Sequence, residues 1–162
     1  NADVPALNPA VLSLLEQGGA GVMDVGGDAA GARVLARFAH KIRMIDHALY
    51  CILNFNRPET ATPEQAEAYL RAIERSAGLF VTGLVNNTHL CAETSEEDVL
   101  RGAALAEEVS RMTGIPVVCH AAAREVIKRI NIPSGELFPM DIYMKKPWEI
   151  DAMEDEKQWQ DE

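Results

Sequence analysis

The chain has 162 residues, of which 48% are hydrophobic and 25% charged, so it holds enough apolar material for one globular core and its body is not disordered. No run approaches the ~18 consecutive apolar residues of a membrane span, and no secretory signal pattern opens the chain. The formal net charge of −10 disfavours nucleic acid as a partner, and the three widely spaced cysteines are typical of a reducing compartment. We therefore expect a cytoplasmic protein.

Short apolar runs alternate with amphipathic segments along the chain. Asn8 and Pro9 predict the start of a first helix, which Gly18 and Gly19 end. A strand is expected over 21–25, and the next helix should bury Val34, Leu35, Phe38 and Ile42.

The second strand is expected over 48–54, and the Thr62–Gln65 capping box then predicts a helix that Gly78 ends. A third strand is expected over 79–86, followed by a helix that Ser95 caps and Gly114 ends. The fourth is expected over 116–120, with a short helix after it and a Pro-punctuated segment that wraps over the body.

This alternation predicts the α/β class, with a mainly parallel sheet and helices on both faces. One domain should cover 3–150. The last twelve residues, 151–162, hold six acidic side chains and one Lys, and are expected to form a flexible acidic tail.

Polar side chains follow each predicted strand, and in parallel α/β sheets ligands bind at the carboxyl edge. The first strand ends in Asp24, Gly26, Gly27 and Asp28, where a carboxylate can hold Mg²⁺ and glycine N–H groups can approach a phosphate. The alternative is a plain helix entry, in which Asp28 caps the helix. We expect Asp24, Asn56, Asn86 and His120 to share one edge of the sheet.

Asn86 ends the third predicted strand, where its amide can pair with a purine edge, and Asn87 follows it. The alternative is a turn asparagine. A zinc site drawn from His89, Cys91, Cys119 and His120 lacks metal-ligand spacing. The roles of Cys91, Cys119, His120 and the acidic tail stay open.

Two common phosphate motifs fail. Gly26 and Gly31 have P-loop spacing, but Ala32 and Arg33 stand where the Lys and the Ser or Thr belong. The dinucleotide fingerprint places Asp28 where its middle glycine belongs, and that carboxylate would repel a pyrophosphate.

Four segments in order, GVMDVGGDAAGARVL, YCILNFNRPET, TGLVNNTHL and IPVVCHAAAREV, resemble the later part of the CobQ/CobB/MinD/ParA nucleotide-binding family, the deviant-Walker P-loop ATPases. The resemblance covers most of residues 4–130. It implies that Asp24 is the Walker B aspartate, that Gly26 and Gly27 belong to switch II, and that Asn86 reads adenine. Family members often have Arg next, where this chain has Asn87, and the P-loop half of the family's fold is missing.

The resemblance predicts a P-loop NTPase-like domain truncated at its N-terminal side. It would be the C-terminal portion of an ATP-binding switch protein that uses ATP and Mg²⁺ when complete and has no ATPase activity by itself. A homodimer or a protein partner is expected. Two alternatives remain: a protein-interaction module on an α/β scaffold, and a Rossmann-like enzyme with a nucleotide cofactor.

Overall fold

The computed structural model describes residue 15, residues 20–141 and residue 143. The first predicted helix, apart from Leu15, and the acidic tail lie outside these residues. The helices are α2 (Ala29–Ala36), α3 (Ala39–Ile42), α4 (Pro63–Ala77), α5 (Glu96–Thr113) and α6 (Arg124–Ile127), with short 3₁₀ turns η1 (Pro58–Thr60) and η2 (Cys91–Glu93). The strands are β1 (Tyr50–Leu53), β2 (Gly83–Asn86), β3 (Val117–Ala123) and β4 (Glu136–Met140).

The four strands form one sheet in the order β1-β2-β3-β4, and every neighbouring pair is parallel. This confirms the α/β class and the parallel sheet. Three of the expected strands appear as β1, β2 and β3. β4 was not predicted, because the segment expected to wrap over the body pairs with β3 instead.

The strand expected over 21–25 was wrong. These residues lie in no strand, and the Val22 side chain is 99% exposed. A strand forms only where a neighbour supplies its ladder hydrogen bonds, and no described strand lies beside this segment as a partner. An apolar run therefore stays unpaired.

The two long helices begin and end where their local signals place them. Thr62 and Gln65 form a reciprocal capping box at the start of α4, and Ser95 and Asp98 form one at the start of α5. Each helix ends at a glycine in the left-handed conformation, with φ of 66° at Gly78. These signals act over a few residues, so the sequence alone was sufficient to predict where the two helices begin and end.

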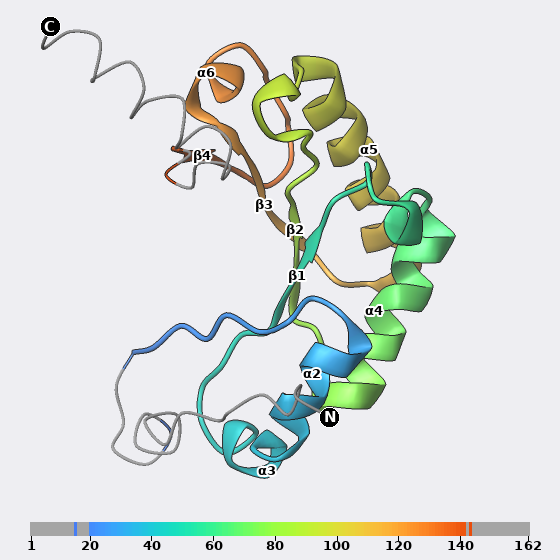
Figure 1. The fold of residues 1–162 in the computed structure, drawn as a ribbon, viewed down its shortest axis with the longest axis vertical. Helices are drawn as coiled ribbons and strands as arrows, with labels where there is room; N and C mark the ends of the chain where they lie inside the picture. The colour runs from blue at the N-terminus through green and yellow to red at the C-terminus, as the bar shows by residue number, and fades with distance from the viewer. Residues whose placement is uncertain (1–14, 16–19, 142, 144–162) are drawn as a thin grey trace, which may run out of the picture.

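The main core lies between the sheet and the pair α4 and α5 (Figure 1). Its buried members come from α4, α5, the strands β1 and β2 and the loops next to the strands. They are Cys51, Leu53, Phe55, Ala66, Leu70, Val81, Leu84, Ala106, Val109 and Ile115. A second cluster joins α2 and α3 to the end of α4, and includes the predicted inner-face residues Leu35, Phe38 and Ile42. The helices α4 and α5 thus pack on the sheet, and α2 and α3 pack on the end of α4.

Helices were expected on both faces, but α4 and α5 cover the same face (Figure 1). Each strand lies next to the one before it, always in the same direction, and crossovers of one hand then place successive helices on a single face. On the opposite face, Tyr50 is 51% exposed, Ile52 58% and Phe138 54%. We call this surface of the described sheet the bare face.

Candidate functional site

The polar residues that follow β1 and β2 meet at the carboxyl edge of the sheet, and His120, within β3, lies opposite Asn86 at the end of β2. The Asn54 amide donates to the backbone oxygen of His89 at 3.2 Å, and its own oxygen accepts from the His89 N–H at 3.3 Å. The Asn56 amide donates to Asp98 at the start of α5, 3.4 Å away. The strand ends and the start of α5 are therefore joined, and Asn56, Asn86 and His120 share this edge as expected.

Asn86 is completely buried, and protein groups use its whole amide. Its Oδ1 accepts from the Thr88 N–H at 3.2 Å and from the Thr88 hydroxyl at 2.7 Å. Its Nδ2 donates to the Val99 carbonyl at 3.3 Å and to His120 Nδ1 at 3.2 Å. In this arrangement Asn86 has no donor or acceptor left for a purine base, which favours a structural role for its side chain.

His120 is also fully buried, and its two ring nitrogens have different partners. Nε2 lies 2.9 Å from the Ser134 carbonyl, which can only accept, so Nε2 carries the proton and Nδ1 accepts from Asn86. Burial lowers the pKa of His120, while the Ser134 hydrogen bond and the charge of Glu107 act in the opposite direction. The ring is a neutral link between β2, β3 and the loop before β4.

Asn87 differs from its neighbour. Its backbone N–H donates to the Leu53 carbonyl at 2.8 Å, which holds it beside the end of β1. Its side-chain Oδ1 is buried and has no hydrogen-bond partner, the one such side-chain atom found in the part of the chain that the structure describes. An unpaired buried acceptor is costly, and it is a place where a ligand donor fits. The sequence could not rank Asn87 above Asn86, because both belong to one turn-like pair.

The Asp24–Asp28 segment lies elsewhere, which corrects the prediction that Asp24 shares the carboxyl edge. Gly26 and Gly27 line a pocket of about 90 Å³ with Leu49, which precedes β1, and with Tyr50, Cys51 and Ile52 from the start and middle of β1. The absent first strand removes the element that would have aligned Asp24 with the other strand ends. Asp24, Gly26, Gly27 and Asp28 are exposed.

Asp28 caps α2, with its Oδ1 2.6 Å from the Gly31 N–H. This is the helix-entry role left open by the sequence, and it occupies one of the N–H groups that a phosphate would need. The backbones of Gly26 and Gly31 are in close contact, since a Cβ on Gly31 would lie 2.6 Å from Gly26 Cα. The glycines therefore serve a tight turn onto α2.

The described residues bear on the zinc alternative and on the expected Mg²⁺ site. No cluster of three or more His, Cys, Asp or Glu side chains that could hold a metal ion occurs among them, which leaves the zinc alternative without a built site there. Mg²⁺ commonly uses only one or two carboxylates and completes its shell with phosphates and water. A lone exposed Asp24 fits that chemistry only if a phosphate is supplied beside it.

The cysteines have three different environments. Burial raises the pKa of Cys51 to about 11, and the charge of Glu74 adds to this effect. Cys91 is exposed, and Cys119 is partly buried with a raised pKa that results mainly from burial. The Cys51 thiol is therefore a packing group in the core.

None of the helices in the described ranges is long and apolar enough to cross a membrane. Fold and site together define an α/β protein with an all-parallel sheet and a polar carboxyl edge. No known family model, curated protein or solved structure matches the chain.

Proposed function

We propose that the chain is the C-terminal portion of a MinD/ParA-like ATP-binding switch protein, P-loop NTPase-like in fold and truncated at its N-terminal side. The observation that carries this proposal is that the helices α4 and α5 cover one face of an all-parallel sheet, while on the other face the edge strands β1 and β4 leave Tyr50, Ile52 and Phe138 exposed. All-parallel sheets occur almost only with both faces covered. One half of a doubly wound fold has this appearance.

The direction of the winding supports the same proposal. In a doubly wound sheet, the units that step one way place their helices on one face, and those that step the other way cover the opposite face. The described strands step only one way, from β1 to β4. The units that would step away from β1 on its other side are the missing half.

The edge of β1 has the properties of an interior strand. Free edges are usually protected by charged residues, proline or bulges. β1 reads Tyr50–Leu53 and has none of these, whereas β4 at the other edge carries Glu136 and Pro139. Val25, at the end of the unpaired segment 21–25, lines the pocket beside Ile52 at this edge. A further parallel strand paired with β1 would bury this segment and fill the pocket.

The roles within the complete site follow the resemblance where the geometry permits. Asp24 lies away from the carboxyl edge in this structure. It would hold Mg²⁺ beside the phosphates once residues 21–25 pair with β1 as a further strand and bring Asp24 to that edge, and Gly26 and Gly27 would leave room for the phosphates. Asn87 would contact the adenine, since its buried Oδ1 has no partner and can accept from the exocyclic amine. Mg²⁺ would supply charge neutralisation at the phosphates.

The test compares this chain with the natural polypeptide extended upstream. We expect the extended protein to bind ATP in calorimetric titration and to hydrolyse it only with an intact Asp24, so Asp24→Asn removes turnover while the control Glu97→Gln, on exposed Glu97 of α5, does not. The 162-residue chain should have no ATPase activity, because it lacks the phosphate cradle and its lysine. Mg²⁺-dependent turnover by the 162-residue chain would contradict the proposal, as would an extended protein that binds no nucleotide.

The adenine contact has its own test in the extended protein. Asn87→Ala should weaken ATP binding by roughly tenfold, about 1.4 kcal/mol, and reduce the preference for ATP over GTP. Thermal stability should stay unchanged, because the Asn87 Oδ1 has no hydrogen-bond partner in the described part of the chain. An unchanged ATP affinity would remove Asn87 from the site.

The second candidate is a protein-interaction module, which the exposed Tyr50, Ile52 and Phe138 side chains favour. A homodimer or a different protein would then cover the bare face. The two candidates differ in whether any form of the protein binds ATP.

A further inference from the structure

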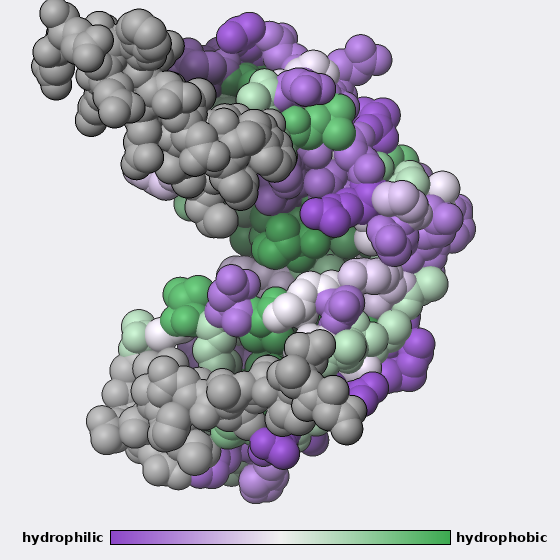
Figure 2. Space-filling model, in the orientation of Figure 1, coloured by the Kyte–Doolittle hydropathy of each residue, from purple (hydrophilic) through white to green (hydrophobic). Residues whose placement is uncertain are grey.

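The bare face is largely apolar: its edge strands expose Ile52 and Phe138, and its inner strands contribute the buried Val85 and Ala121. Pairing places Ile52, Val85, Cys119 and Glu136 in one row across the sheet, and Ala121 beside Phe138 in the next. Tyr50 and Val118 meet over Gly83, where a Cβ would lie 2.4 Å from Val118 Cγ2. Figure 2 shows hydrophobic side chains gathered in the hollow on this side of the molecule.

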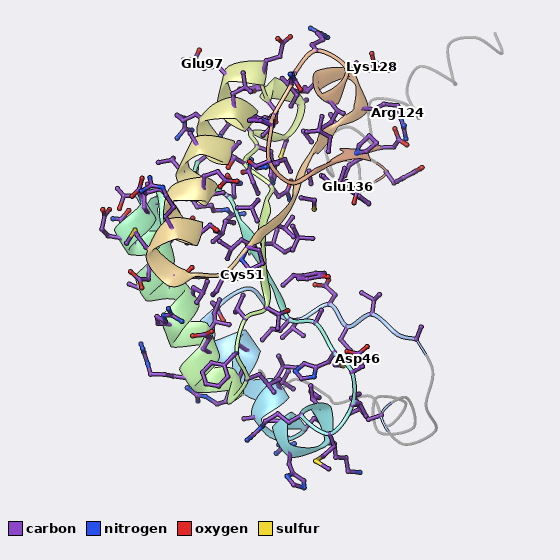
Figure 3. The ribbon with its side chains drawn as sticks, turned by 180° about the vertical axis from the view of Figure 1, so that it is seen from behind. Asp46, Cys51, Glu97, Arg124, Lys128 and Glu136 are labelled. Carbon is purple, nitrogen blue, oxygen red and sulfur yellow. The ribbon has the colours of Figure 1, made fainter. Side chains whose placement is uncertain are left out.

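Glu136 is the exception in this surface. It is exposed, it belongs to the row that contains Ile52, and no ion pair is found for it in the described part of the chain. Figure 3 shows Glu136 and Asp46 on the same open side of the sheet, at opposite ends of the hollow. Asp46 is likewise exposed and has no ion pair among the described residues.

These carboxylates restrict what can cover the face. A cover that buries Glu136 without a cation would strip a charge of water and leave it unpaired, which is strongly unfavourable. A second copy of the chain brings the same acidic groups and a net charge of −10. An apolar cover with basic side chains at its margin meets both the apolar rows and the carboxylates.

We propose that the bare face is the docking surface of an amphipathic helix with an apolar stripe and lysine or arginine residues at its margin. This inference rests on the proposed function, because the helix is the one that the missing half of the fold would contribute. Helices are the elements that cover parallel sheets, and the apolar rows match the stripe. The helix residue that lies over Glu136 should be a lysine or arginine, because it has to pair with this carboxylate.

The test uses the 162-residue chain and two synthetic helical peptides of about 14 residues, ~21 Å long. Both peptides carry the same leucine stripe, and one has lysines at its margin where the other has glutamates. We expect the lysine peptide to bind at least tenfold more tightly in fluorescence anisotropy, with the preference reduced by salt. Equal binding of the two peptides would overturn the charge argument.

Matched variants locate the binding surface. Ile52→Asp and Phe138→Asp should each weaken the lysine peptide at least tenfold, while Leu100→Asp, on the 43%-exposed Leu100 of α5, should not. Glu136→Gln should remove most of the lysine preference, and Glu97→Gln on α5 should leave it intact. Circular dichroism checks that each variant is folded, and two face variants ensure that one remains testable.

Several results would overturn the proposal. Binding that survives both face substitutions would place the peptide elsewhere. Sedimentation that shows a dimer dispersed by Ile52→Asp would assign the face to a second copy. Neither measurement involves nucleotide, so a failure here is separate from a failure of ATP binding in the extended protein.

Discussion

Replacing Asn86 tests whether this residue holds the fold or contacts a ligand. Asn86→Ala removes four hydrogen bonds, two accepted from Thr88 and two donated to Val99 and His120. At ~1 kcal/mol for each bond, with three of them at 3.2–3.3 Å, the loss of unfolding free energy should be about 3–4 kcal/mol. This is a large share of the ~5–15 kcal/mol typical of a domain.

Urea unfolding followed by circular dichroism measures this loss, and Asn87→Ala is the matched control. The control should cost less than ~0.5 kcal/mol, because the Asn87 Oδ1 has no hydrogen-bond partner among the described residues. Both variants should retain the unfolding slope of the wild type. A loss below ~1 kcal/mol for Asn86→Ala, or equal losses for both variants, would refute the structural role derived from its contacts.

Three more predictions concern the same core. Burial lowers the pKa of His120 below its ordinary value of 6.5, so the unfolded chain binds the proton more readily than the folded chain. The contribution of His120 to stability is therefore complete above about pH 6.5 and falls as the pH drops below it. Urea midpoints at pH 7.5 and 5.5 should show this fall, and His120→Asn should reduce it. Gly102→Ala should destabilise by about 1–3 kcal/mol in the same assay, since the new Cβ would lie 2.2 Å from Thr88 Oγ1, and a neutral effect would contradict this packing. Cys51 should resist a disulfide reagent at pH 8 until the chain unfolds, because its pKa is about 11 and it is buried, whereas exposed Cys91 should react at once; equal rates would be inconsistent with these environments.

Local signals in the sequence predicted the helices well. The capping boxes at Thr62 and Ser95 and the terminal glycines each act within one turn, so no tertiary information was needed. Strand pairing is different, since it depends on a neighbour. The run over 21–25 has the composition of a strand and no partner, while β4 contains Pro139 and still pairs with β3.

The sequence predicted where several site residues lie, but not which hydrogen bonds their side chains make. Strand ends placed Asn56 and Asn86 correctly, because parallel strands end at one edge. His120 joins them because it lies opposite Asn86, although β3 continues three residues beyond the predicted end. Which amide keeps free hydrogen-bonding capacity depends on Thr88 and Val99, whose positions only the packed fold defines. The Asp24 segment moved away from this edge because its placement required the strand that did not form.

The strand order has a consequence for how the chain folds. Each ladder joins strands that are consecutive in the chain, so every β-helix-β unit can close across a single crossover as soon as it is made. Pairing of consecutive strands costs less chain entropy than pairing of strands from distant parts of the chain. Pairing of β1 and β2 does not wait for β4, and synthesis from the N-terminus would produce the units in the order in which they stack. Folding of this sheet can therefore advance one strand at a time, behind the ribosome.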